Sequence, residues 1–170
     1  VKVLGPVPVI AAGGIADGAA IADVLAAGAQ AASLCTRFVA SVEADAFQDY
    51  KQRIVKAIAD DTVMTTLFDI GWPNANHRVI RNTTYERWEA AGKPASGERP
   101  GEKQDIGELA LGEHRVLLQR YCVIPPLSGF DGDLESMPLY AGHSVDGIHD
   151  IAPAADIIAR LHDELRRAVN

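Results

Sequence analysis

The sequence predicts an α/β fold in which parallel strands alternate with crossover helices. Two short apolar runs, Val7–Ile10 and Ala31–Leu34, have the composition of buried strands, and a loop and a helical stretch follow each of them. The chain opens at Val1 and enters the first run almost at once. We therefore expect this part of the chain to continue a longer protein.

The first helical stretch has a start, an apolar face and an end. Asp17 has the short polar side chain that caps helix N-termini. Ile21, Val24 and Leu25 recur at the i, i+3, i+4 spacing of one helix face, and Gly28 suits a C-terminal cap. A helix between Asp17 and Gly28 follows from this pattern.

The second helix is predicted over residues 44–59, and a final helix begins at Pro153. The apolar positions that define the helix over 44–59 are Phe47, Tyr50, Ile54, Val55 and Ile58. Those that define the final helix are Ile157, Ile158, Leu161, Leu165 and Ala168. We expect both sets to be buried, because each forms one continuous stripe.

Residues 61–170 are less regular than residues 1–60. A short helix is predicted over Thr84–Ala91 and an extended segment over Val116–Ile124. Residues 92–105 contain glycine, proline and charge with almost nothing apolar, which predicts an exposed, mobile excursion. Asn82-Thr83-Thr84 matches a glycosylation sequon, a short match that we interpret as coincidence in a loop.

Composition excludes several classes of partner. The net charge of −7 and the pI near 5.1 argue against nucleic acid and anionic membranes, which both attract basic surfaces. Cys35 and Cys122 are the only cysteines, so neither a disulfide framework nor a cysteine metal motif is predicted. No apolar run reaches the roughly 20 residues that span a bilayer. A reducing, cytoplasmic location is the expectation.

The residues with chemical meaning lie where the first strand ends. Gly13 and Gly14 separate this strand from the following helix, and glycine lets backbone N–H groups approach a phosphate closely while the helix adds its positive end. Cys35-Thr36-Arg37 forms the equivalent loop one unit later. In (β/α)8 barrels, a phosphate site is commonly built from the loops after the last two strands. The competing interpretation is a tight turn whose glycines only serve packing.

Longer motifs add a resemblance to a known family. Residues 8–40, PVIAAGGIADGAAIADVLAAGAQAASLCTRFVA, resemble the flavin-phosphate region of the nitronate monooxygenases, formerly called 2-nitropropane dioxygenases. Residues 67–73 (LFDIGWP), 77–82 (HRVIRN) and 139–145 (LYAGHSV), with His149-Asp150-Ile151, resemble later segments of the bacterial members. The likeness covers nearly the whole chain. It implies the C-terminal portion of a (β/α)8 TIM barrel: residues 1–60 as the last two βα units and 61–170 as segments packed over it.

The resemblance also implies a cofactor and its binding residues. FMN is implied, with its phosphate held by Gly13, Gly14, Ser33, Leu34, Cys35 and Thr36. His143 and Ser144 are implied near the substrate. The family usually has glycine in place of Cys35, so a cost in FMN affinity is expected if that position needs positive φ or crowds the phosphate. It usually has glutamine in place of His143.

The implied reaction is the oxidation of an alkyl nitronate by O2 to a carbonyl compound and nitrite. The family's catalytic histidine belongs to an earlier strand, and none of the five histidines here (His77, His114, His143, His149, His162) matches its motif. We therefore expect this chain alone to be inactive. Two alternatives stay open: an FMN-dependent enoyl-ACP reductase, and a non-catalytic phosphate-binding module.

Two residues of the second loop have ordinary interpretations as well. Cys35 is more simply a small residue at the end of a strand than a nucleophile, because no activating partner is identifiable. Arg37 either neutralises the phosphate or points to solvent or to a carboxylate, and we favour the second. Trp72 is interpreted as a packing anchor in a loop.

Overall fold

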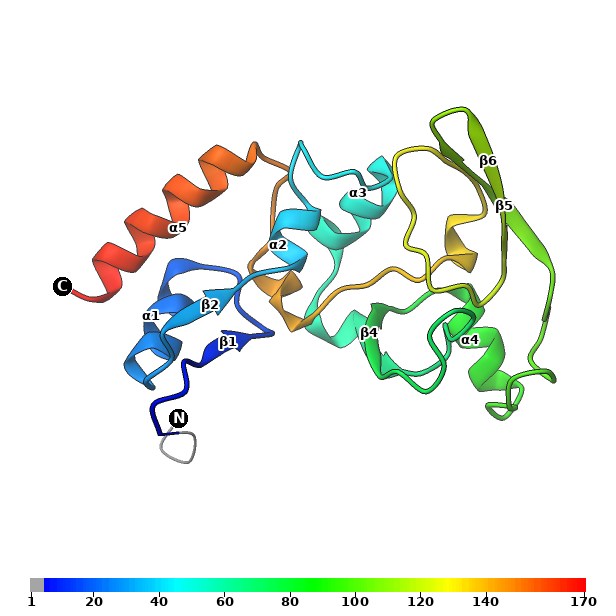
Figure 1. The fold of residues 1–170 in the computed structure, drawn as a ribbon, viewed down its shortest axis with the longest axis horizontal. Helices are drawn as coiled ribbons and strands as arrows, with labels where there is room; N and C mark the ends of the chain where they lie inside the picture. The colour runs from blue at the N-terminus through cyan, green and yellow to red at the C-terminus, as the bar shows by residue number, and fades with distance from the viewer. Residues whose placement is uncertain (1–4) are drawn as a thin grey trace.

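The computed structural model describes residues 5–170 (Figure 1). A small parallel sheet lies at one end of the molecule with helices α1 and α5, and the hairpin of β5 and β6 lies at the other end. Helices α2 and α3 lie between them. The α/β class predicted from the sequence is confirmed.

The parallel sheet consists of β1 (Ile10–Ala12) and β2 (Ala31–Ser33), paired from Ile10 with Ala31 to Ala12 with Ser33. The second strand was predicted correctly. The first lies later than the predicted 7–10, and it is not buried, because 55% of Val7 and 65% of Ile10 are exposed. The reason is that β1 has β2 as its only strand neighbour among residues 5–170.

Helix α1 (Gly18–Ala26) begins as predicted, with the Asp17 side chain accepting from the N–H of Ala20 at 2.8 Å. Its first residue packs tightly against α5 (Ala154–Ala168). A Cβ on Gly18 would lie 2.3 Å from the backbone nitrogen of Leu165, closer than atoms pack. Gly18 is therefore the point at which the two helices touch.

Helix α5 buries a narrower stripe than predicted. Ile157 is 1% exposed, but Ile158 is 57% exposed, so its predicted burial is wrong. Consecutive helical residues point about 100° apart. Since α5 lies on the edge of the molecule and packs through one face, only one of two adjacent isoleucines reaches the interior.

The predicted helix over 44–59 is present in shortened form as α3 (Gln48–Lys56), and a short helix, α2 (Thr36–Val39), precedes it. Tyr50 and Ile54 are buried as expected. Ile58 is 56% exposed, which makes its predicted burial wrong. It lies beyond the end of α3, where the helical spacing no longer sets its direction.

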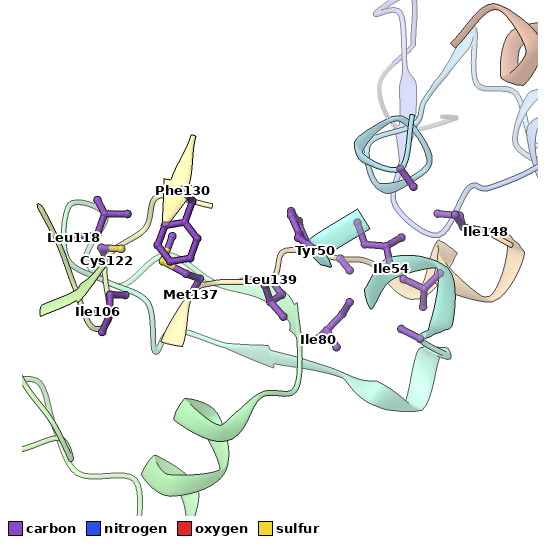
Figure 2. Close-up of a cluster of buried hydrophobic side chains, with 14 of the residues drawn as sticks. Tyr50, Ile54, Ile80, Ile106, Leu118, Cys122, Phe130, Met137, Leu139 and Ile148 are labelled. Atoms are coloured by element: carbon purple, nitrogen blue, oxygen red, sulfur yellow. The ribbon is translucent and has the colours of Figure 1, made fainter. Parts of the chain in front are cut away.

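One apolar core joins the two predicted parts of the chain. In Figure 2 it extends from Ile106 and Leu118, on the two strands of the β5–β6 hairpin, past Tyr50 and Leu139, to Ile148. A second cluster consists of Leu67, Phe68, Val79, Tyr85 and Tyr121. Residues 61–170 thus complete a core that residues 1–60 begin.

An antiparallel pair, β3 (Thr62–Thr65) with β4 (His77–Ile80), precedes helix α4 (Thr83–Ala90), which matches the predicted short helix. Asn82 caps α4: its side chain accepts from the N–H of Tyr85 and donates to the carbonyl of Met137. Asn82 is 2% exposed. The sequon therefore offers no accessible amide, and it lies at a helix start and not in the predicted loop.

The second sheet has the order β6-β5-β7, from β5 (Asp105–Leu111), β6 (His114–Gln119) and β7 (Phe130–Gly132). The predicted extended segment over 116–124 is correct only as far as Gln119. Beyond it the chain turns, and Tyr121 has a φ of +73°. Three short 3-10 helices, Ala59–Asp61, Leu134–Ser136 and His143–Gly147, complete the fold.

The segment 92–105 lies largely on the surface, as predicted, but it is not free of the core. Arg99 is 5% exposed, and its guanidinium binds Asp69 at 2.7 Å, Glu102 at 2.5 Å and the carbonyl of Leu67 at 2.8 Å. It also lies 4.1 Å from the centre of the Tyr121 ring. The hydrogen bond from Arg99 holds the pKa of Glu102 below its usual range. The prediction that residues 92–105 are exposed is therefore wrong at Arg99, which is buried and bound to residues of the core.

We predict that Arg99→Ala destabilises the protein that carries this chain by about 2–4 kcal/mol, because it leaves two half-enclosed carboxylates without their cation and removes the contact with Tyr121. The measurement is the free energy of unfolding in urea. Arg115→Ala, which breaks an exposed ion pair with Glu108, is the control and should change it by less than about 0.5 kcal/mol. Equal effects of the two substitutions would contradict the assigned role of Arg99.

Candidate functional site

The two predicted loops and a distant segment of the chain meet in one pocket, which we call the glycine-loop pocket. Its volume is about 170 Å³. The residues that line it are Gly13, Gly14, Ile15, Ser33, Cys35, Thr36, Gly142 and Ser144. Six of these were predicted as site residues. Ile15 and Gly142 were missed.

The glycine turn gives this pocket its backbone donors. Gly13 and Gly14 have φ of +94° and +73°, a region that side chains rarely adopt, and a Cβ on either would meet no atom within 4 Å. The N–H groups of Gly14 and Ile15 donate to no protein acceptor among residues 5–170. Successive free N–H groups in such a turn are suited to binding an anion.

Two of the first amides of α1, which were predicted to add the positive end of the helix, already have acceptors within the protein. The N–H of Gly18 donates to Glu164 at 2.9 Å, and the N–H of Ala20 donates to Asp17. Two carboxylates thus occupy two of the first three amides of α1, and the N–H of Ala19 has no acceptor among residues 5–170. The turn that precedes α1 adds the free N–H groups of Gly14 and Ile15.

Hydroxyl groups supply the remaining polar lining. Thr36 Oγ1 accepts a hydrogen bond of 3.1 Å from the N–H of Gly142, across 106 residues of chain, and keeps its own proton to donate. The hydroxyl-bearing residues Ser33 and Ser144 also line the pocket, and Ser144 is 6% exposed. The lining holds no carboxylate, imidazole or cationic side chain, so it offers neutral donors to an anion.

Cys35 lines this pocket in a relaxed backbone conformation. Its φ of −107° and ψ of −66° are available to any residue. The suggestion that this position favours glycine because it needs positive φ is therefore wrong. Cys35 is exposed and Cys122 is buried, and neither forms a disulfide.

Arg37 binds a carboxylate, as favoured from the sequence. The residue is 4% exposed and donates to the side chain and the carbonyl of Asp150, both at 2.9 Å, and to the carbonyl of Ala40 at 3.0 Å. Asp150 also pairs with Arg160 at 2.8 Å. Hydrogen bonds from Arg160 and charge from both arginines hold the pKa of Asp150 below its usual range. Arg37 is committed to this network and does not line the glycine-loop pocket.

Two predicted residues stand apart from the pocket. Leu34 is half-buried after β2, and His143 is exposed at the start of its 3-10 helix; neither lines the pocket. None of the five histidines lines it. His77 is buried, and the loss of solvent lowers the pKa of its imidazole, which bonds to the carbonyl of Ala75. Within residues 5–170, no three potential ligands gather as a metal site, and no helix is long and apolar enough to cross a bilayer.

Comparison with known proteins assigns the chain to a family. A sequence model of the family described as nitronate monooxygenase matches residues 1–164. The chain belongs to the nitronate monooxygenase family. A nitronate monooxygenase of Neurospora crassa is 27% identical over 96% of this chain and 39% of its own length.

Solved structures support the α/β fold of the chain. FabK from Thermotoga maritima superposes with a TM-score of 0.64 at 33% identity, over 96% of this chain and 45% of its own. A nitroalkane oxidase from Streptomyces ansochromogenes superposes with a TM-score of 0.65 at 25% identity, over 99% of this chain and 42% of its own. The chain thus spans less than half the length of these relatives, and it represents an oxidoreductase family.

The Thr36–Gly142 hydrogen bond gives a test of how this pocket is held together. Thr36→Val keeps the size of the side chain but removes the acceptor, so the partly buried N–H of Gly142 loses its partner. We expect a loss of about 1–2 kcal/mol in the free energy of unfolding of the full-length protein. Thr36→Ser keeps the hydroxyl and serves as the control. If the valine and serine variants are equally stable, the hydrogen bond does not hold the two segments together.

Proposed function

We propose that the protein carrying this chain oxidises alkyl nitronates with O2 to a carbonyl compound and nitrite, and that this chain holds the phosphate of FMN. The observation that carries the proposal is the convergence of Gly13, Gly14, Ser33, Cys35, Thr36 and Ser144 on one uncharged pocket. These residues come from the two loops and the later segment that belong to the family resemblance. Membership of the family supports the reaction class.

The binding of FMN would begin at its phosphate. The free N–H groups of Gly14 and Ile15 and the hydroxyl of Thr36 would donate to the phosphate oxygens, with Ser33 and Ser144 at the rim. A volume of about 170 Å³ is below the roughly 300 Å³ at which pockets enclose larger ligands, so the pocket suits the phosphate and not the whole cofactor. When bound, FMN supplies the redox chemistry and the protein positions it.

The rest of the active site would come from outside this chain. β1 and β2 would be the last two strands of a (β/α)8 barrel, which explains why Val7 and Ile10 are exposed in a two-stranded sheet. The chain spans 39–45% of the relatives compared above. With no histidine at the pocket, the base that removes a substrate proton would lie on an earlier strand. We expect the full-length protein to be active and this chain alone to be inactive.

The alternatives make different demands on the protein. An FMN-dependent enoyl-ACP reductase would use the same phosphate site but would reduce a double bond. A non-catalytic module would bind phosphate without turnover. The nitronate monooxygenase family match over residues 1–164, together with the nitronate monooxygenase of Neurospora crassa that matches 96% of the chain, favours the oxidation.

An activity assay separates these three functions. The full-length protein is loaded with FMN and given propionate 3-nitronate, and nitrite release and O2 consumption are followed. We expect both to proceed without added NADH. In a parallel assay with NADH and an enoyl thioester, NADH-driven reduction of the double bond without nitrite release from the nitronate would support the reductase. The absence of either activity in a flavin-loaded protein would support the non-catalytic module.

FMN affinity tests the phosphate site directly, by fluorescence titration of the full-length protein. Gly14→Val places a branched side chain in the pocket at a φ of +73° and should weaken binding more than about tenfold, or about 1.4 kcal/mol. Gly112→Val, at a φ of +62° in the β5–β6 turn, is equally strained but remote, and should leave affinity unchanged. Cys35→Gly should change affinity by less than about twofold, because Cys35 has an ordinary backbone conformation. Unchanged affinity in Gly14→Val would remove the phosphate from this turn.

A further inference from the structure

Residues 142–150, which we call the bridging segment, contact both loops of the glycine-loop pocket from a later part of the chain. The N–H of Gly142 donates to Thr36 Oγ1 at 3.1 Å, which joins the segment to the second loop. Gly147 lies against Ala16, the residue that follows the glycine turn: a Cβ on Gly147 would lie 2.7 Å from the Cβ of Ala16. The segment thus approaches the first loop as closely as atoms allow.

The bridging segment is itself held in place from two sides. Its apolar residues Val145 and Ile148 are both 0% exposed and belong to the main core. At its end, Asp150 accepts from Arg37 through both its side chain and its carbonyl, each at 2.9 Å. Because Arg37 follows Thr36 directly in α2, this ion pair fixes Thr36 beside the bridging segment.

Two residues of the bridging segment act on the pocket without lining it. Neither Gly147 nor Asp150 is part of the lining, so neither would touch a bound phosphate. Gly147 acts through Ala16, which follows the glycine turn. Asp150 acts through Arg37, which follows Thr36. A set of neutral donors binds an anion well only when the donors are held so that they converge on it, and here that convergence depends on the bridging segment.

We propose that Gly147 and Asp150 are positioning residues for the cofactor phosphate, an assignment that rests on the function proposed above. Gly147 lets the bridging segment approach the glycine turn, and Asp150 fixes α2 against that segment. The charge of Asp150 separates this role from an electrostatic one. A carboxylate near a phosphate opposes its binding by charge alone, so an acidic residue that strengthens phosphate binding does so through geometry.

The test compares FMN with riboflavin, which has the same ring system and no phosphate. The affinity for each is measured by fluorescence titration of the full-length protein. A residue that positions the phosphate donors changes the affinity for FMN and leaves the affinity for riboflavin unchanged, whereas a general loss of structure lowers both. The readout is therefore the ratio of the FMN affinity to the riboflavin affinity.

Asp150→Ala removes the carboxylate that binds Arg37 and Arg160, and it should lower this ratio about fivefold, the size expected for one lost hydrogen bond. Charge alone predicts the opposite sign, because the variant removes a negative charge and leaves both arginines uncompensated. Asp150→Asn keeps one acceptor for Arg37 and should restore part of the ratio. Asp131→Asn, which removes an exposed carboxylate of β7, is the control for charge and should leave the ratio unchanged.

Gly147→Ala tests the second contact and keeps the proposal testable if Asp150→Ala does not fold. The added methyl group would push the bridging segment away from Ala16 and should lower the ratio about threefold, because the donors no longer converge. Gly129→Ala is the matched control. Its Cβ would lie 2.6 Å from the carbonyl oxygen of Ala110 on β5, at the other end of the molecule (Figure 1), so it is equally crowded but remote. It should lower stability and leave the ratio unchanged.

An unchanged or raised ratio in Asp150→Ala, or an unchanged ratio in Gly147→Ala, would overturn the role of that residue. Equal losses of affinity for FMN and riboflavin would show a purely structural role and would overturn it as well. These failures are separable from a failure of the proposed function. A parent protein that does not prefer FMN to riboflavin lacks the phosphate site, and both proposals fall. A parent protein that prefers FMN but oxidises no nitronate overturns the reaction and leaves the positioning role intact.

Discussion

The arrangement of the site depends on the hydrogen bonds that the buried guanidinium of Arg37 donates to Asp150 and Ala40. Arg37 follows Thr36 directly, and its three hydrogen bonds fix the carbonyl of Ala40 on one side and Asp150 on the other. Asp150 in turn holds Arg160 of α5. The short helix α2, the segment 142–150 and α5 are therefore tied to one side chain. The Thr36–Gly142 hydrogen bond then shapes the glycine-loop pocket within that frame.

Because Arg37 binds Asp150, the proposed phosphate would be bound without an arginine, in a chain whose net charge is itself negative. The chain carries a net charge of −7, and Arg37, which follows Thr36 in the chain, directs its two terminal nitrogens to Asp150 and to the carbonyl of Ala40. Its buried Nε has no acceptor among residues 5–170. Two amides at the start of α1, those of Gly18 and Ala20, are engaged as well, by Glu164 and Asp17. The donors that remain for an anion are neutral: the N–H groups of Gly14 and Ile15 and the hydroxyl of Thr36. Neutral donors fix the direction of a hydrogen bond but attract an anion less strongly than a cation does. Recognition of a phosphate here would rest on the geometry of the glycine turn.

The segment 92–105 shows how composition alone misjudges a loop. Its glycines, prolines and charges predict exposure, and most of it is exposed. Arg99 is the exception, because Asp69, Glu102 and Tyr121 enclose it from three directions. A charged residue is buried only when such partners surround it. Two of these three partners lie more than 20 residues away, so no local pattern announces the contact.

The sequence by itself determined the α/β class, the family, the capped start of α1, the glycine turn and most of the residues that line its pocket. These follow from local rules: side-chain spacing, cap chemistry and the preference of positive φ for glycine. Only the tertiary structure decided that Ile58 and Ile158 are exposed, that Cys35 is unstrained and that Arg37 binds Asp150. It alone brought Gly142 to Thr36. Each of these depends on which distant segment packs against a residue or on how the chain bends there, and spacing along the sequence carries no record of either.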